Sequence, residues 1–475
     1  WDTVEWLIQN IKNNNGKVGM YGVSYPGFYT VMGSINAHPA IECTSPQAPI
    51  SDWFLWDDMH HNGAFTLPLC FNFFQVFGQD RPEPTMSWGN RPDYPSADAY
   101  HFFLDMGPIK NANENYLKGE IAFWNEMTDH PDYDEFWQDR STLPHLKDIR
   151  PAVLTVGGWY DSEDLSGALH TYKTIEAENP KATNMLVMGP WIHGGWSSPD
   201  YNRPSRIPFR ETDKYFYQKE IEYPFFSYYL KGKGDLDLPE AWIFETGSDS
   251  WRAFDTWPPE DVTEKVLYLS EVGRLSFSKP DSKKDSYDSY ISDPSKPVPY
   301  TAPFLSARSF YNREYLSEDQ RFAATRPDVL VYDGETLDKA ITIAGPVEIE
   351  LYVSTTGTDA DWVVKLIDVF PDTADNRGLS RNEIEVGGYQ MLIRGDIFRG
   401  KYRNSFEHPE PFAPGEVTKV RFTLPDVNHT FKEGHRMMVQ VQSSWFPLFD
   451  RNPQTFTNIY TCEKEAFIKA THRVY

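Results

Sequence analysis

The stretch from Lys17 to Phe28 constrains the fold of this chain more than any other. It contains Gly22-Val-Ser-Tyr-Pro-Gly27, a G-x-S-x-x-G variant of the nucleophile elbow, in which a strand turns sharply into a helix and exposes a serine hydroxyl. Glycines at the flanking positions let the strand and the helix approach closely. Such a match also arises by chance or in an ordinary turn, so its surroundings must support it.

The residues on either side of this stretch supply that support. Asp2 and Glu5 match the spacing of a helix capping box, and apolar residues then recur at helical spacing as far as Ile11. Residues 18–21 predict a buried strand, and residues 24–38 predict a second helix. The resulting order of helix, strand, elbow and helix is that of an α/β-hydrolase core.

An acid and a histidine follow two further predicted strands. Asp161 comes after the apolar strand 152–156, and His193 comes after the strand 184–188. Open α/β sheets gather their chemistry at the carboxyl ends of the strands, and the chain order Ser, Asp, His is that of α/β-hydrolases. We therefore predict a catalytic triad in which Ser24 attacks a carbonyl carbon, His193 transfers its proton and Asp161 orients the imidazole.

Other histidines compete for the role of base. His60, His61 and His170 do not directly follow a predicted sheet strand, so His193 is preferred. The alternative for His193 itself is a histidine that is hydrogen-bonded within its loop. The backbone N–H of Tyr25 is predicted to donate one hydrogen bond to the oxyanion, and a second donor is expected from a loop after an earlier strand.

Three further carboxylates are predicted to lie near the nucleophile. Glu163 and Asp164 follow Asp161, and Asp58 lies in the segment that leads into the aromatic residues 66–148. Carboxylates at such a place repel one another unless they face a cation, and a substrate ammonium group would satisfy them. Alternatively, Glu163 and Asp164 open the next helix, whose positive end favours acids. The residues alone leave both interpretations open.

The rest of the chain suggests four segments. Residues 1–65 and 149–240 are predicted to form an α/β-hydrolase core, and residues 66–148, aromatic and helical, a cap inserted between the two parts. Residues 241–475 contain many short strands, as is typical of a jelly-roll β-sandwich. The hydrolase sheet requires strands before the elbow strand, so its amino-terminal part is expected to precede residue 1.

Composition excludes several classes of partner. The net charge of −24 argues against nucleic acid or an anionic membrane. No apolar run approaches the ~18 residues of a membrane-spanning helix. Cys43, Cys70 and Cys462 permit at most one disulfide and lack metal-site spacing, and no metal or cofactor is predicted.

Several stretches in order resemble the α-amino acid ester hydrolases, which belong with cocaine esterase, proteins described as glutaryl-cephalosporin acylases and X-prolyl dipeptidyl-peptidases. These are residues 1–7, 22–27, 57–65, 158–164 and 188–193, together with residues 394–403 and the stretch on to Asp450. The resemblance implies an α/β-hydrolase domain, a helical cap and a carboxyl-terminal jelly roll. It also implies that Ser24, Asp161 and His193 form the triad.

The resemblance bears on the carboxylates as well. In these hydrolases a carboxylate cluster binds the α-ammonium group of the substrate, and its positions match Asp58, Glu163 and Asp164. This favours the ammonium interpretation. The second oxyanion donor of the family is a tyrosine hydroxyl, expected in the part of the core before residue 1. Export to the periplasm or secretion, and assembly into a homo-oligomer, are further expectations from the family.

These observations predict a serine hydrolase or acyltransferase. Its substrates would be small amino acid esters, amides or short peptides, and the reaction would proceed through an acyl-Ser24 intermediate. Acyl transfer to β-lactam nuclei would be included. Alternatives are an X-Pro dipeptidyl-peptidase, a general carboxylesterase, or a carbohydrate-binding jelly-roll protein with an inactive hydrolase half. An intact set of Ser24, Asp161 and His193 argues against the last.

Overall fold

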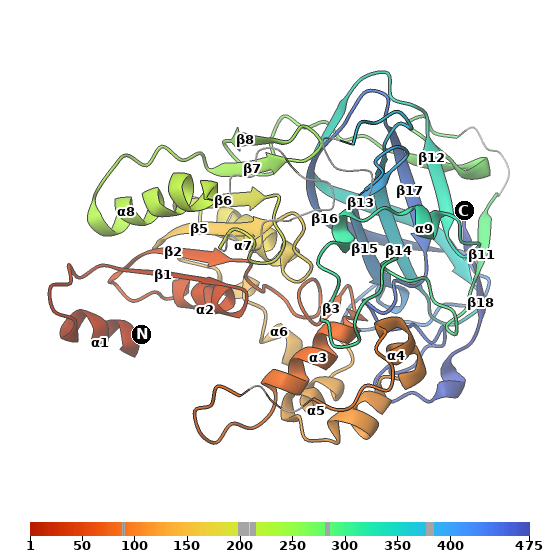
Figure 1. Cartoon of the computed structure of the whole chain (residues 1–475), viewed down its shortest axis with the longest axis horizontal. Coiled ribbons are helices and arrows are strands. Elements are labelled where there is room, and N and C mark those ends of the chain that lie inside the picture. Colours follow the sequence, from red (N-terminus) through yellow and green to blue (C-terminus); the bar gives the residue numbers. More distant parts are fainter. Residues whose placement is uncertain (88, 90, 198–208, 210–214, 281–285, 377–383) are drawn as a thin grey trace.

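The computed structural model describes the chain from residue 1 to 475 apart from residues 88, 90, 198–208, 210–214, 281–285 and 377–383. Figure 1 shows an α/β unit beside a β-rich unit, with a group of short helices next to both. This is the predicted combination of an α/β-hydrolase core, a helical cap and a carboxyl-terminal β domain.

A six-stranded sheet forms the α/β unit. Its order is β1-β2-β5-β6-β7-β8, with parallel pairing up to β7 and antiparallel pairing of β8. The central strands are buried almost throughout, as expected for parallel strands covered on both faces. The strands are β1 (Val18–Val23), β2 (Ile41–Gln47), β5 (Ala152–Gly158), β6 (Asn184–Gly189), β7 (Ala241–Glu245) and β8 (Ser250–Phe254).

Helices cover both faces of this sheet because successive side chains of a strand point in opposite directions. Val153 of β5 packs with Val31 and Ile175, whereas its neighbour Leu154 packs with Phe225 on the other face. The helices are α1 (Asp2–Asn10), α2 (Tyr25–Ser34), α7 (Leu165–Glu178), the π-helix η4 (Tyr217–Glu222) and α8 (Tyr223–Lys231).

Two details near the amino terminus differ from the prediction. Asp2 lies inside α1, with Trp1 at the N-cap and no capping hydrogen bond from a side chain, so the capping box is wrong. Glu5 instead contacts the imidazole of His38, with Oε2 and Nε2 2.9 Å apart. Helix α2 ends at Ser34, before the predicted end at His38, because the next residue has an extended backbone.

The assignment of β7 and β8 to the jelly roll is also wrong. Ala241 of β7 pairs in parallel with Leu186 of β6, and β8 folds back onto β7. Both strands therefore extend the α/β sheet beyond residue 241. A short strand of alternating residues looks the same in either sheet, and only its pairing partner distinguishes the two.

Short helices form the cap, and many of its aromatic rings are buried in the core. Phe71 is fully buried, and its ring centroid lies 5.8 Å from that of Phe102 and 5.6 Å from that of Phe103. The cap comprises α3 (Leu67–Phe77), α4 (Ala99–Met106), the π-helix η1 (Ala112–Leu117), α5 (Ala122–Thr128), α6 (Glu135–Gln138) and the 3-10 helix η2 (Leu143–His145).

The β-rich unit contains two sheets, of order β15-β14-β17-β12-β10-β9 and β11-β18-β13-β16. They pack face to face: Trp362 contacts His472, with ring centroids 5.2 Å apart, and Phe398 stacks on Phe422 at 5.3 Å. The strands are β9 (Tyr268–Ser270), β10 (Arg274–Ser276), β11 (Asp288–Ser292), β12 (Leu330–Gly334), β13 (Ile341–Thr355), β14 (Asp361–Val369), β15 (Gln390–Arg399), β16 (Thr418–Phe431), β17 (Arg436–Gln442) and β18 (Ala470–Val474). Short helices connect them: η5 (Glu271–Gly273), η6 (Tyr315–Ser317), α9 (Arg321–Ala324), η7 (Gly400–Tyr402) and η8 (Lys464–Ala466).

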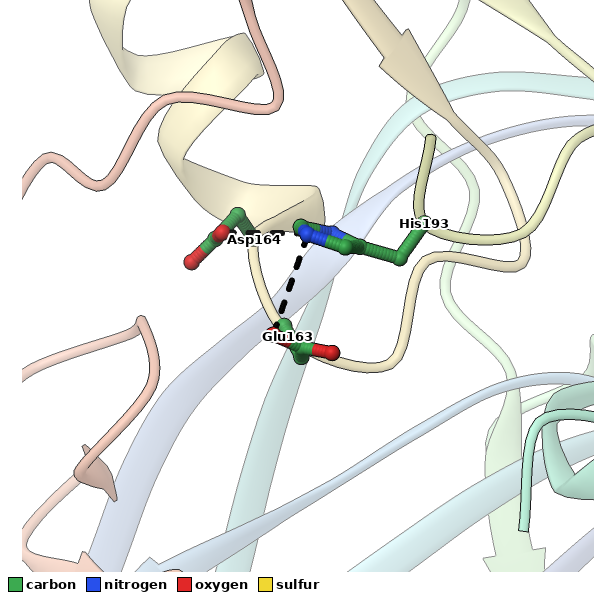
Figure 2. Close-up of side chains that lie close together, drawn as sticks. All are labelled: Glu163, Asp164 and His193. Atoms are coloured by element: carbon green, nitrogen blue, oxygen red, sulfur yellow. Dashed lines mark ion pairs between the residues drawn. The ribbon is translucent and has the colours of Figure 1, made fainter. Parts of the chain in front are cut away.

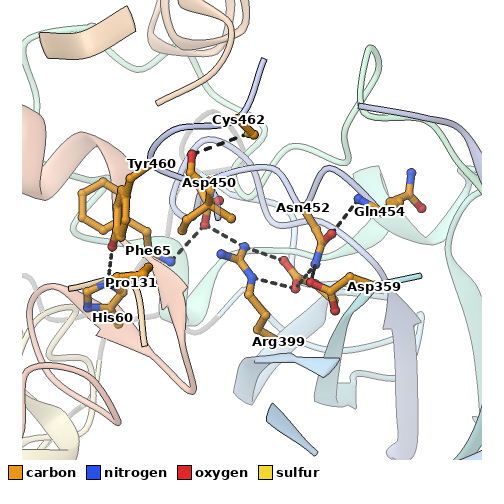
Figure 3. A network of polar contacts seen from close by, with 12 residues as sticks. His60, Phe65, Pro131, Asp359, Arg399, Asp450, Asn452, Gln454, Tyr460 and Cys462 are labelled. Carbon is orange, nitrogen blue, oxygen red and sulfur yellow. Dashed lines mark hydrogen bonds and ion pairs between the residues drawn. The ribbon is translucent and has the colours of Figure 1, made fainter. Parts of the chain in front are cut away.

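A buried ionic network joins the β-rich unit to the hairpin of β3 (His60–His61) and β4 (Ala64–Phe65), which follows Asp58. Arg399 Nη2 lies 2.9 Å from Asp361 Oδ2 and 2.8 Å from Asp450 Oδ1, and all three side chains are buried. Figure 3 shows Arg399 beside Asp450. Asp450 also accepts a hydrogen bond of 2.9 Å from the backbone N–H of Phe65. The β-rich unit therefore fixes the segment that carries Asp58.

Candidate active site

Ser24 lies at the turn between β1 and α2, in a strained conformation. Its φ of 67° and ψ of −128° are rare for a non-glycine residue and are typical of a nucleophile elbow. A Cβ atom at Gly22 would lie 2.5 Å from Pro26, and one at Gly27 would lie 2.4 Å from the backbone oxygen of Gln47. The elbow therefore requires both glycines.

His193 and Asp161 meet at the carboxyl ends of β6 and β5. His193 Nδ1 lies 2.9 Å from Asp161 Oδ2 and 3.0 Å from Oδ1. The loop after His193 reaches the elbow, because a Cβ atom on Gly194 would be 3.4 Å from Val23 Cγ1. Within the described part of the chain, Ser24 Oγ makes no hydrogen bond to His193. That contact is often long before substrate binds.

The charges around His193 decide its protonation. Burial lowers the pKa of His193, but the carboxylates of Asp161, Glu163 and Asp58 outweigh burial and raise it from 6.5 to about 10. With its neighbouring carboxylates ionised, the imidazole therefore holds its proton more tightly than a free histidine does. A cation among these carboxylates would return His193 toward the neutral form that a general base requires.

The three rival histidines have other partners. Burial lowers the pKa of His60 to about 3, and its Nε2 lies 2.5 Å from the hydroxyl of Tyr460. His61 contacts Asp396 of β15. His170 stacks on Trp56 with ring centroids 3.8 Å apart.

Tyr25 occupies the first position of α2. The backbone N–H at such a position has no partner within its helix, so it is free to donate to an oxyanion above Ser24. Desolvation by burial raises the pKa of the Tyr25 hydroxyl, and the charge of Asp58 adds to the shift.

The structure brings Asp58, Glu163 and Asp164 together. The backbone N–H of Asp58 lies 3.4 Å from the carbonyl oxygen of Glu163. Burial raises the pKa of Asp58, and the charge of Glu163 raises it further. Burial likewise raises the pKa of Asp164, followed by the charge of Asp58. Asp164 is fully buried, yet neither of its carboxylate oxygens accepts a hydrogen bond among the described residues.

Figure 2 shows the imidazole of His193 between Glu163 and Asp164. Its Nε2 lies 3.7 Å from Glu163 Oε2, and its Nδ1 lies 3.9 Å from Asp164 Oδ2. These three residues could each offer a ligand atom to a metal ion, since the atoms lie within 4.8 Å of one another. Because Asp161 already bonds to Nδ1, a metal here would engage Nε2, which the predicted mechanism uses for proton transfer.

Tyr311 is a site residue that the sequence does not indicate. Its buried hydroxyl donates a hydrogen bond to Glu163 Oε1. Tyr311 lies 148 positions further along the chain, in a segment without a motif, so only the folded structure brings the two together. Through this hydrogen bond Tyr311 orients the carboxylate of Glu163.

Comparison with known protein families gives two matches. Residues 1–195 match the model of the X-Pro dipeptidyl-peptidase (S15 family), and residues 234–475 match the X-Pro dipeptidyl-peptidase C-terminal non-catalytic domain. No helix in the described residues has the length and apolar character needed to cross a membrane.

Individual relatives cover the whole chain. The cocaine esterase of Rhodococcus sp. (strain MB1 Bresler) is 28% identical, with 100% of this chain and 81% of that protein covered. The crystal structure of an aminopeptidase from a marine sediment Thaumarchaeota archaeon has a TM-score of 0.89 and 38% identity, covering 100% of this chain and 77% of that one. The structure of an α-amino acid ester hydrolase has a TM-score of 0.92 and 36% identity, with the same coverage.

Proposed function

We propose that this protein cleaves esters or amides of α-amino acids whose amino group is free. The chain belongs to the X-Pro dipeptidyl-peptidase (S15) family, in its CocE/NonD group of serine hydrolases. The observation that carries this proposal is the carboxylate of Asp164, which is fully buried and accepts no hydrogen bond from the described residues. A buried carboxylate needs a donor or a cation, and a substrate ammonium supplies both.

The proposed reaction proceeds through an acyl-enzyme. Ser24 Oγ attacks the substrate carbonyl carbon while His193 Nε2 accepts the hydroxyl proton, and the N–H of Tyr25 stabilises the oxyanion. His193 then protonates the leaving alcohol or amine. Water, or an amine nucleophile such as a β-lactam nucleus, attacks the acyl-Ser24 ester, which releases the acid or forms a new amide.

Ammonium binding also prepares the base in this proposal. The carboxylates that raise the pKa of His193 include Glu163 and Asp58. An ammonium group beside Asp58, Glu163 and Asp164 offsets part of their charge, and the pKa of His193 falls. Substrates with a free amino group therefore meet a neutral imidazole, whereas substrates without one meet a larger fraction of imidazolium.

A peptidase that acts on free amino termini is the second candidate. The cluster of Asp58, Glu163 and Asp164 would bind a peptide amino terminus as well as an amino ester, and the similar archaeal structure is described as an aminopeptidase. The two functions share the ammonium site and differ in the leaving group.

Steady-state kinetics on three substrates distinguish these functions: phenylglycine methyl ester, its N-acetyl derivative and an X-Pro p-nitroanilide. The proposal predicts the highest kcat/KM for the free amino ester and covalent trapping of an acyl group on Ser24. Faster cleavage of the X-Pro anilide would favour the peptidase, and equal rates on the free and acetylated esters would favour a general esterase. Ser24→Ala should abolish every activity.

A further inference from the structure

Asp164 occupies the place from which an aspartate usually caps a helix, yet it does not cap α7. It is the N-cap residue of this helix, and its side chain forms no capping hydrogen bond within the described chain. An N-cap aspartate normally has an extended backbone and accepts a hydrogen bond from the N–H of the second or third helical residue. Asp164 instead has a φ of −123° and a ψ of 37°. The first turn of α7 therefore needs another acceptor.

Asp57 supplies this acceptor from a distant part of the chain. Gly167, the third residue of α7, donates its backbone N–H to Asp57 Oδ1 over 2.8 Å. Asp57 is fully buried, so this hydrogen bond is shielded from water. A Cβ atom at position 167 would lie 1.9 Å from the backbone oxygen of Pro49. Only glycine therefore lets the segment that leads to Asp57 approach the helix so closely.

The second oxygen of Asp57 is fixed by its own loop. Oδ2 accepts hydrogen bonds from the backbone N–H of Ser51 at 2.9 Å, from the hydroxyl of Ser51 at 2.7 Å and from the backbone N–H of Asp52 at 3.2 Å. Four donors thus hold one carboxylate in a single orientation. Asp58 is the next residue, and its backbone N–H lies 3.4 Å from the carbonyl oxygen of Glu163. These bonds therefore hold the segment with Asp58 against the segment that begins α7.

We propose that Asp57 is a positioning residue that caps α7 in place of Asp164 and so leaves the Asp164 carboxylate available to the substrate ammonium. An aspartate that caps its own helix turns an oxygen toward the helix N–H groups, where a ligand cannot use it. Asp161 assists, because its Oδ1 accepts the backbone N–H groups of Glu163 and Asp164 at 2.9 and 3.1 Å. Both oxygens of Asp164 then remain without a hydrogen bond from the described residues. This inference rests on the function proposed above.

The variant Asp57→Asn tests the exchange of caps. Asparagine has one acceptor oxygen, and the three donors of residues 51 and 52 should attract it. The amide NH2 group then faces the N–H of Gly167, which loses its acceptor. Asp164 should turn to cap the helix, and a crystal structure of the variant should show an Asp164 oxygen within hydrogen-bond distance of Gly167 N. An Asp164 side chain that keeps its place would overturn the proposal.

Kinetics give a readout that a merely structural role would not move. In Asp57→Asn the ratio of kcat/KM for phenylglycine methyl ester to kcat/KM for its des-amino analogue should fall about 10-fold, with the des-amino value nearly unchanged. Adding Asp164→Asn to this variant should lower the ratio little further, because Asp164 is already engaged by the helix. Independent, additive losses in the two single variants would contradict the proposal.

Asp52→Asn is the matched control. Asp52 lies in the same loop and is also buried, but its Oδ1 accepts the backbone N–H groups of Phe54 and Leu55 instead of one from α7. This variant should lower the Tm and leave the selectivity for the amino ester unchanged. Equal losses of selectivity in Asp52→Asn and Asp57→Asn would reduce Asp57 to a structural residue.

The proposed function and this inference fail in different ways. A wild-type protein without preference for the amino ester would contradict the function, and the crystal structure of Asp57→Asn would still show which acid caps α7. If Asp57→Asn does not fold, the stability of Asp164→Asn decides. That substitution should not lower the free energy of unfolding, since Asp164 does not cap the helix, and a loss would overturn the inference.

Discussion

Two groups of carboxylates in this protein, one buried and one partly buried, differ in how their charge is balanced. In the Asp361–Asp450 pair, Arg399 bonds to both acids, and Figure 3 shows its contact with Asp450. In the cluster of Asp58, Glu163 and Asp164, no lysine or arginine of the described chain forms an ion pair with any member. Both groups lie near the same hairpin.

The comparison separates a structural role from a binding role. Arg399 is an internal counterion, and it makes the pair a fixed link between the β-rich unit and β4. Among the described residues the cluster has the imidazole of His193, whose ring nitrogens lie 3.7 Å from Glu163 Oε2 and 3.9 Å from Asp164 Oδ2, in place of a permanently charged counterion. Acids that repel one another at the carboxyl ends of the sheet weaken the folded protein, and perturbed carboxylates of this kind mark a candidate binding site.

The largest expected effect is on the structural pair. Arg399→Met leaves two buried carboxylates unpaired and should lower the free energy of unfolding by about 3–5 kcal/mol. Arg436→Met, which removes a half-exposed pair with Asp333, is the matched control and should cost less than about 1 kcal/mol. Urea unfolding measures both. Equal losses would show that the buried network has no special part in stability.

In the cluster of Asp58, Glu163 and Asp164, a substitution is expected to change the free energy of unfolding in the opposite direction. Asp164→Asn removes a buried charge without a hydrogen bond and should raise the free energy of unfolding by about 1–3 kcal/mol. Burial raises the pKa of Asp164 in the folded state. Wild-type stability should therefore fall as the pH rises from the pKa of this carboxyl in the unfolded chain to its pKa in the folded protein. The stability gained by Asp164→Asn should grow over the same pH range. A loss of stability would instead indicate that Asp164 mainly serves the positive end of α7.

A smaller effect is expected from Tyr311. Tyr311→Phe removes the hydrogen bond to Glu163, so the carboxylate loses its orientation toward the substrate ammonium. The KM for an amino ester should rise about 10-fold, with kcat nearly unchanged. Tyr332→Phe, which removes a hydroxyl bonded to Asp288 in the β-rich unit, serves as control. An equal rise in KM for the des-amino ester would indicate a general structural defect instead.

The smallest effect is expected in how the kinetic constants depend on pH. Because the pKa of His193 is raised to about 10, kcat/KM for a des-amino ester should keep rising with pH until the imidazole loses its proton near that value. For an amino ester the bound ammonium lowers this pKa in the enzyme–substrate complex, so kcat, which reports that complex, should rise at lower pH than kcat for the des-amino ester. Activity should then fall above pH ~8, where the substrate amine becomes neutral. Superimposable profiles would contradict the proposed coupling.

Sequence patterns predicted the placement of the candidate site better than its support. Ser24, Asp161 and His193 each follow a strand, and parallel strands bring their carboxyl ends together, so local signals were sufficient to place these residues at one edge of the sheet. Tyr311 reaches Glu163 from a loop of the β-rich unit, where nothing in the local pattern reveals the contact. Strands β7 and β8 were misassigned for a related reason, since pairing with β6 is a long-range property.

The central claim is that the cluster binds the ammonium group of the substrate. The most direct measurement is kcat/KM for phenylglycine methyl ester and for its des-amino analogue, in the wild-type protein and in Asp164→Asn. The account predicts a strong wild-type preference for the amino ester, reduced about 10-fold or more in the variant while the des-amino rate stays nearly constant. A preference that is absent in the wild type, or equal in both proteins, would contradict it.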